Sequence, residues 1–238
     1  MFVKNSHSPR PHFLIEACVS TIEDAILAAQ AGADRLEISA ALETDGVTPS
    51  LGMLKEIVAA VHIPVVTLIR IRSGHFVYDH HEIRAMLADA QAAIECGSVA
   101  IAVGCLTPTG ELDRPAMQLF ADRIGGERCV CHRAFDQNHD QFTAAKQLIE
   151  IGYQRILTSG GAPSAVVGIS QLQRLQEQCG SRIEILPAGG IHPDNIIQVL
   201  EQTGCTQVHG SFRQTTLANS PPRLDAGLLA AARNRLEG

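Results

Sequence analysis

The 238-residue chain has no long hydrophobic run and no dense cluster of basic residues. No stretch approaches about 18 uninterrupted apolar residues, and the N-terminal residues lack the apolar core of a signal peptide, so we expect no membrane association and a cytoplasmic location. The formal charge is −6, without a long Lys/Arg run, which argues against nucleic acid as the main partner. A small molecule or a metal ion is the expected ligand.

Paired cysteine motifs are also missing. The seven cysteines lie between Cys18 and Cys205 and none forms a CxxC pair, so a structural zinc site is not expected. An odd number of cysteines in a chain of this size favours reduced thiols over a disulfide framework. Cys129 and Cys131 share one side of a predicted strand, which could hold Cu(I), but we interpret them as small apolar core residues.

Short β-branched segments alternate with Ala/Leu-rich segments of helical period along the whole chain, a pattern typical of βαβ units. Ser20 is the expected N-cap of the first helix, with Glu23 three residues later and Gly32 at its end. Residues 214–222 are expected to form a loop and 223–236 the last helix. Eight strands are predicted, at 13–18, 35–39, 64–70, 99–104, 129–133, 155–158, 183–187 and 207–209.

Eight βα units favour a closed parallel barrel over an open sheet. No GxGxxG follows the first strand, which weakens a dinucleotide-binding alternative. The length suits one (β/α)8 barrel, which typically has about 250 residues, and no linker separates a second domain. The predicted fold is therefore α/β: residues 1–238 form a single-domain (β/α)8 TIM-type barrel of parallel strands.

Polar side chains stand at the ends of several predicted strands, where barrel active sites are built. Glu16 and Cys18 have the same parity on the first strand, and Glu37 and Ser39 repeat this pattern on the second, so each pair points to one side. A ring of such groups requires mutual ion pairs or a ligand. The other strand-end residues are Arg70, Arg72, His132, Arg133, Asp136 and His209.

Two glycine-bearing turns follow late strands: Thr158-Ser159-Gly160-Gly161, and Gly189-Gly190 after Ala188. Glycine lets backbone N–H groups approach an anion, and helices expected to begin near Ser164 and Pro193 would add their positive ends. An anionic ligand is one interpretation, with Arg70, Arg72 or Arg133 as countercharge. A tight βα turn without a ligand is equally compatible with each loop.

Seven segments of the chain form a characteristic series: GADRLEIS, DGVTPS, LIRIRSGHFVYD, CHRAFD, RILTSGG, LPAGGI and VHGSF. In their order and spacing the chain resembles the CutC family over residues 13–213. The resemblance implies a barrel fold, a cytoplasmic location, a homodimer and a role in copper homeostasis through Cu(I) binding.

The resemblance also implies a pair of thiols, because family members often have a cysteine at the end of each of the first two strands. This chain keeps Cys18 but has Ser39 at the second position. A hydroxyl is a poor ligand for soft Cu(I), so Cys18 would need another donor, such as His132 or His209.

Three hypotheses follow. The first is a copper-binding homeostasis protein that uses Cys18. The second is a lyase, isomerase or hydrolase acting on a small anionic or phosphorylated metabolite, with Glu16 or Glu37 as base, His132 as acid or oxyanion stabiliser and Asp136 as a further catalytic candidate. The third is a noncatalytic interaction protein.

Overall fold

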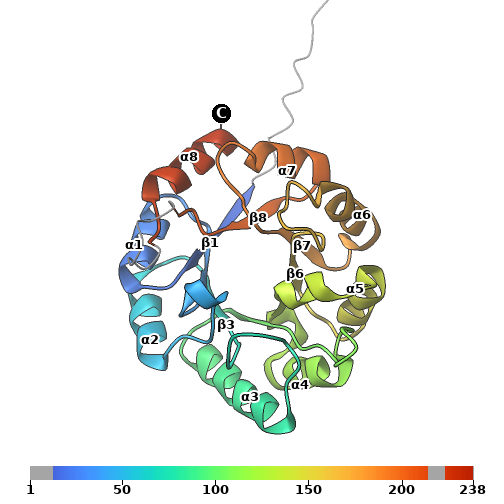
Figure 1. Cartoon of the computed structure of the whole chain (residues 1–238). Helices are drawn as coiled ribbons and strands as arrows, with labels where there is room; N and C mark the ends of the chain where they lie inside the picture. The colour runs from blue at the N-terminus through green and yellow to red at the C-terminus, as the bar shows by residue number, and fades with distance from the viewer. Residues whose placement is uncertain (1–12, 214–222, 238) are drawn as a thin grey trace, which may run out of the picture.

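The computed structural model describes residues 13–213 and 223–237, in which eight parallel strands lie inside a ring of helices (Figure 1). The predicted (β/α)8 barrel is confirmed. The strands are β1 (Leu14–Val19), β2 (Arg35–Ile38), β3 (Val65–Leu68), β4 (Ala100–Val103), β5 (Cys129–Cys131), β6 (Arg155–Thr158), β7 (Glu184–Pro187) and β8 (Gln207–Gly210). The helices are α1 (Ile22–Gln30), α2 (Leu51–Ala60), α3 (His80–Glu95), α4 (Arg114–Ile124), α5 (Gln141–Glu150), α6 (Ile169–Cys179), α7 (Ile196–Thr203) and α8 (Ala226–Glu237).

The barrel is nearly closed. Strands that follow one another in sequence pair in parallel from β1 to β7, and β8 pairs with β1. The two end strands β7 and β8 lie side by side. A side-chain hydrogen bond from Gln207 Nε2 to Glu184 Oε2, 3.1 Å long, links them.

Each strand presents alternate residues to the barrel interior and to the helices. On β1, Ile15, Ala17 and Val19 are fully buried in the main apolar core, while Glu16 and Cys18 point inward as their parity predicts. Strands β3 to β7 contribute a second apolar cluster to the interior. Strands β8, β1 and β2 contribute polar groups, and β6 adds the buried Arg155. The apolar cluster contains Val66, Leu68, Ala100, Ala102, Val130, Leu157, Leu186 and Ala188.

Several predicted boundaries need correction. The N-cap of α1 is Thr21, whose side chain accepts from Asp24 N, and not Ser20. Strands β3 and β5 end two residues before the predicted Arg70 and Arg133, because the chain turns into loops there. Helices α6 and α7 begin later than the expected Ser164 and Pro193. The expected 214–222 loop lies outside the described residues.

Among the described helices, none has both the length and the hydrophobicity needed to cross a bilayer.

Candidate functional site

A cavity of about 510 Å³ opens where the strands end. It collects side chains from β1, β2, β3, β6 and β8 and from the loops after β2, β3, β5 and β7. The sequence-predicted site residues that line it are Cys18, Glu37, Arg70, His132, Arg133, Asp136, Gly189, Gly190 and His209. Glu16, Arg72, Thr158, Ser159, Gly160 and Gly161 do not line it.

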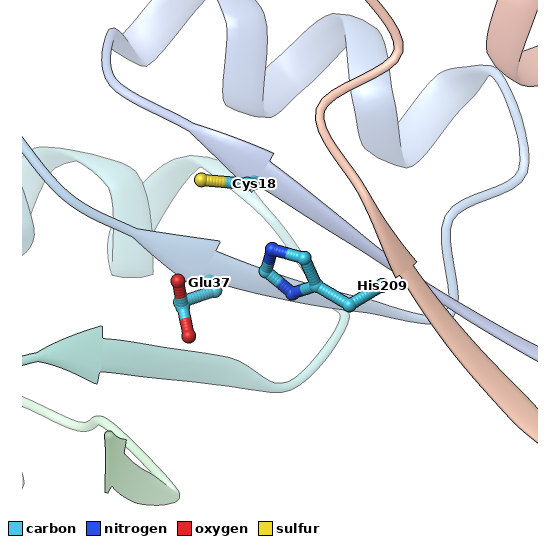
Figure 2. Close-up of side chains that lie close together, drawn as sticks. All are labelled: Cys18, Glu37 and His209. Carbon is cyan, nitrogen blue, oxygen red and sulfur yellow. The ribbon is translucent and has the colours of Figure 1, made fainter. Parts of the chain in front are cut away.

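Three side chains of types that can ligate a metal converge on one side of this cavity: Cys18 from β1, Glu37 from β2 and His209 from β8 (Figure 2). Their potential ligand atoms all lie within 4.8 Å of one another. Donor atoms that share one ion, with bonds of about 2.0–2.3 Å, lie up to about 4.5 Å apart. The three groups are therefore spaced to share an ion after a small adjustment. His132, also predicted as a ligand, is not part of this group.

Glu16 lies beside this group and orients the histidine. It is 2% exposed and forms an ion pair with Arg35 on β2, the residue opposite it in the parallel register. Its Oε1 also accepts a 2.7 Å hydrogen bond from His209 Nδ1. Because Nδ1 is engaged there, Nε2 is the nitrogen that remains for Cys18 or for a metal ion. Burial alone would raise the pKa of Glu16, but Arg35 and His209 hold it well below its ordinary value.

Glu37 and His209 have shifted pKa values for opposite reasons. Burial raises the pKa of Glu37 to about 7, and the nearby Glu16 adds to this increase. His209 has the opposite effect, because its positive charge lowers the pKa of Glu37. Burial alone would lower the pKa of His209, but Glu37, Cys18 and Glu16 together hold it well above its ordinary value. These neighbours favour the protonated form of His209, so a metal ion that binds Nε2 would displace the proton there.

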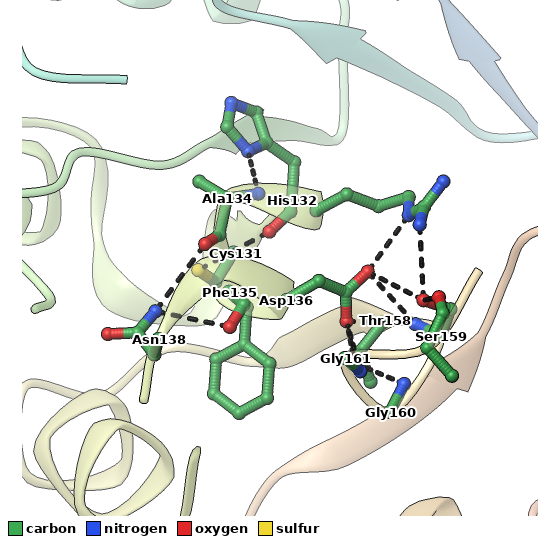
Figure 3. Close-up of polar contacts among 12 residues, drawn as sticks. Cys131, His132, Ala134, Phe135, Asp136, Asn138, Thr158, Ser159, Gly160 and Gly161 are labelled. Carbon is green, nitrogen blue, oxygen red and sulfur yellow. Dashed lines mark hydrogen bonds and ion pairs between the residues drawn. The ribbon is translucent and has the colours of Figure 1, made fainter. Parts of the chain in front are cut away.

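His132 lies across the cavity at the end of β5 and is neutral. Burial and the charge of Arg70 lower its pKa to about 3. Its Nδ1 accepts a 3.1 Å hydrogen bond from Ala134 N, which places the proton on Nε2 (Figure 3). This buried Nε2 has no hydrogen-bond partner in the described structure.

The three predicted anion-binding arginines differ in their surroundings. Arg72 lies outside the cavity, where its Nε donates to Glu82 Oε1 at 2.6 Å. Arg133 lines the cavity with a half-exposed side chain and donates to Asp136 and Ser159. Arg70 is 3% exposed and donates to backbone carbonyls of the loops after β2 and β3.

The loop after β6 binds the chain's own carboxylate (Figure 3). Asp136 Oδ1 accepts from Thr158 Oγ1 at 2.5 Å, from Ser159 N at 3.0 Å and from Gly161 N at 3.1 Å. Its Oδ2 accepts from Arg133 Nε at 2.9 Å. The N–H groups of Ser159 and Gly161, in which the sequence indicated an anion site, thus donate to an internal anion.

The second glycine turn faces the cavity directly. Gly189 and Gly190 have φ values of 94° and 73°, which L side chains rarely adopt. Their carbonyl oxygens accept 2.8 Å hydrogen bonds from Ala165 N and Asn195 Nδ2. These bonds fix the turn as part of the cavity wall.

Phe76 and Gly104, both next to His132, are among the residues around the site that the sequence alone did not indicate. The Phe76 ring lies 4.8 Å from Arg70 Cζ and 5.0 Å from the His132 ring centroid. Gly104 directly follows β4, so close to His132 that a Cβ there would lie 2.6 Å from its ring. Phe76 stands inside the segment SGHFVYD and Gly104 at a strand end, but neither position signals contact with His132 without the fold.

Comparison with known proteins shows which family this chain belongs to. The model of the CutC family matches residues 13–214. The chain belongs to the CutC family. The human copper homeostasis protein cutC homolog is 39% identical over 203 residues, covering 85% of this chain and 74% of the human protein. A CutC family protein of Glaesserella parasuis is also 39% identical, covering 84% of this chain and 82% of its own.

Solved structures agree with the fold. A crystal structure of CutC from Streptococcus agalactiae has a TM-score of 0.79 and 32% identity, and covers 84% of this chain and 98% of its own. Phosphoribosylanthranilate isomerase from Thermotoga maritima reaches a TM-score of 0.61 at 13% identity, covering 95% of this chain and 99% of its own. At that identity the likeness concerns the barrel fold alone. The cavity at the mouth of the barrel is the candidate functional site of this CutC-family protein.

Proposed function

We propose that this CutC-family protein handles copper by binding one Cu(I) ion at the mouth of the barrel, through Cys18 Sγ and His209 Nε2. The observation that carries the proposal is the convergence of Cys18, Glu37 and His209 within 4.8 Å. The naming of the human relative as a copper homeostasis protein supports it.

The chemistry of the donors suits copper in part. Thiolate and imidazole are good ligands for Cu(I), whereas a carboxylate is a hard donor that Cu(I) does not favour. Cys18 and His209 would therefore bind the ion, while Glu37 would balance charge nearby. Glu16 supports this arrangement because its hydrogen bond to Nδ1 fixes the ring orientation.

We further propose a cytoplasmic location and a homodimer. All seven cysteines are free thiols, which suits a reducing compartment. The dimer follows from the family resemblance, and light scattering on the purified protein tests it.

Anaerobic Cu(I) titration against a competing chelator tests the copper site. We expect 1:1 binding that is lost in Cys18→Ala. Cys96→Ala is the matched control, because Cys96 is the only partly exposed cysteine and lies at the end of α3. Equal affinity in the wild type and Cys18→Ala would exclude Cys18 as a ligand.

Acid–base catalysis on a small molecule is a second candidate function, favoured by one observation. Glu37 and His132 both line the cavity. The pKa of Glu37 is raised to about 7, and that of His132 is lowered to about 3. A carboxylate near neutrality can take and return a proton, and a neutral imidazole can donate a hydrogen bond to a developing oxyanion.

Mass spectrometry of a metabolite extract incubated with the protein tests this second function. We expect the wild type to consume a metabolite that Glu37→Gln leaves unchanged. Identical extracts after incubation with both proteins would count against catalysis.

A further inference from the structure

Arg70 is a buried cation without a carboxylate partner among the described residues. The Tyr78 hydroxyl lies close enough to interact with it but is neutral, because burial raises the pKa of Tyr78 to about 12. A buried charge is normally paired, because leaving water is costly. The hydrogen bonds of its two terminal nitrogens, 2.8–3.2 Å long, all go to backbone carbonyls, those of Thr44, Asp45, Gly46 and Gly74.

Two N–H groups of the cavity wall also lack acceptors. Arg70 Nε and His132 Nε2 are both buried and have no hydrogen-bond partner. A buried donor left unpaired costs about 1–3 kcal/mol. The two side chains belong to the same cavity, and the charge of Arg70 is close enough to lower the pKa of His132.

The Phe76 ring lies against both side chains. It makes a cation–π contact with Arg70, at 4.8 Å from Cζ, and a tilted ring contact with His132, at 5.0 Å between centroids. Contacts with an aromatic ring compensate an N–H group only weakly. Phe76 is half-buried and belongs to the loop between β3 and α3, so it can turn aside without disturbing a strand.

We infer that Arg70 and His132 form a covered subsite for the anionic group of a small organic molecule, with Phe76 as the displaceable cover. A carboxylate or phosphate oxygen between the two N–H groups would neutralise Arg70 and satisfy both donors. The cavity of about 510 Å³ is far larger than an inorganic ion needs and falls within the range of small-molecule sites. The body of the ligand would lie toward the apolar wall formed by Leu68, Leu157 and Ala188.

This subsite supplies a ligand class for the second candidate function and does not depend on copper binding. Binding is measured rather than turnover, so the absence of catalysis or of copper binding would leave the result interpretable. Inorganic phosphate and oxalate are the probes, because they present the two anionic groups in their simplest form.

NMR titration of the ¹⁵N-labelled full chain with each probe is the test. We expect saturable binding in the millimolar range for at least one probe, with shifts of the His132 Nε2 and Phe76 backbone amide signals. His132→Asn should weaken binding at least about tenfold. Asparagine retains an acceptor for Ala134 N but lacks the far N–H group, so the local turn should survive.

One control variant makes the result specific. Arg84→Met removes an exposed arginine of α3 that lies outside the cavity. It should bind the probe as the wild type does. Binding of phosphate alone or of oxalate alone would identify the anionic group, whereas no binding, or equally weak binding in wild type and His132→Asn, would overturn the subsite.

Discussion

The Cys18 Sγ lies 3.9 Å from the Ser39 Oγ at the ends of β1 and β2. The side chain at position 39 therefore faces the thiol where related CutC proteins are expected to have a second cysteine. A sulfur at this distance could share one Cu(I) ion with Cys18, whereas the hydroxyl cannot contribute a soft ligand.

Ser39→Cys should therefore raise the affinity for Cu(I) by roughly tenfold or more, because a thiolate replaces a poor donor. Competition titration with a chelator under reducing conditions measures the change. Ser98→Cys is the matched control, since Ser98 is equally buried but hydrogen-bonds Thr67 away from the cavity. If Ser39→Cys and wild type bind Cu(I) equally, the ion does not occupy the space between these two strand ends.

Asp136 should matter more for stability than its position on the cavity wall indicates. Asp136→Asn replaces one acceptor oxygen by an NH₂ group that faces the donors of Ser159 or Arg133. We expect a loss of about 2–3 kcal/mol in the free energy of unfolding, because charged hydrogen bonds are broken and donors are left unpaired.

Urea denaturation measures this loss. Asp122→Asn is the control, since Asp122 is exposed on α4 and accepts from only Gln118 in the described structure. Equal stability of the Asp136 and Asp122 variants would mean that the glycine loop does not need its internal anion.

Gly104 should be intolerant of even a methyl group. In Gly104→Ala the new Cβ would lie 2.6 Å from the His132 ring and 2.8 Å from the Ala134 Cβ. Relief requires His132 to move, which we expect to cost about 1–3 kcal/mol. Thermal unfolding measures the cost, with Gly52→Ala as control because nothing lies within 4 Å of a Cβ there. Similar melting temperatures for the two variants would contradict the contact.

The barrel and the group of polar residues that line its mouth cavity could be predicted from the sequence, because both depend on local periodicity. Alternation along β1 and β2 correctly put Glu16 with Cys18 and Glu37 with Ser39. Which polar groups pair with each other depends on the register between strands, which a single sequence does not specify. Glu16 meets Arg35 and His209 only because those residues stand opposite it on β2 and β8.

The glycine loop after β6 illustrates the same limit. Its composition was compatible with an anion site or with a tight turn that binds no ligand, and its N–H groups donate to a carboxylate of the chain itself. The carboxylate belongs to Asp136, which is more than twenty residues away in sequence and arrives through the 3-10 turn after β5. A local motif predicts the donors, but the acceptor is decided by tertiary structure.

His132 should make the wild type sensitive to acid. Its pKa is about 3 in the folded protein and about 6.5 in an unfolded chain. Between these values the unfolded state binds a proton that the folded state does not, so His132 lowers stability as the pH falls below about 6.5. Glu37 acts oppositely, because its raised pKa of about 7 favours the folded state as the pH falls from 7 toward the unfolded value near 4.5.

Because these two effects oppose each other in the wild type, the contribution of His132 is visible only as a difference between proteins. The stability of the wild type relative to His132→Asn should fall by about 2 kcal/mol between pH 7 and pH 4.5. Urea denaturation at both pH values measures it, with the exposed His62→Asn as control. A pH-independent difference would mean that His132 can be protonated in the folded protein, which would require Nδ1 to lose the hydrogen bond from Ala134 N and to gain an acceptor.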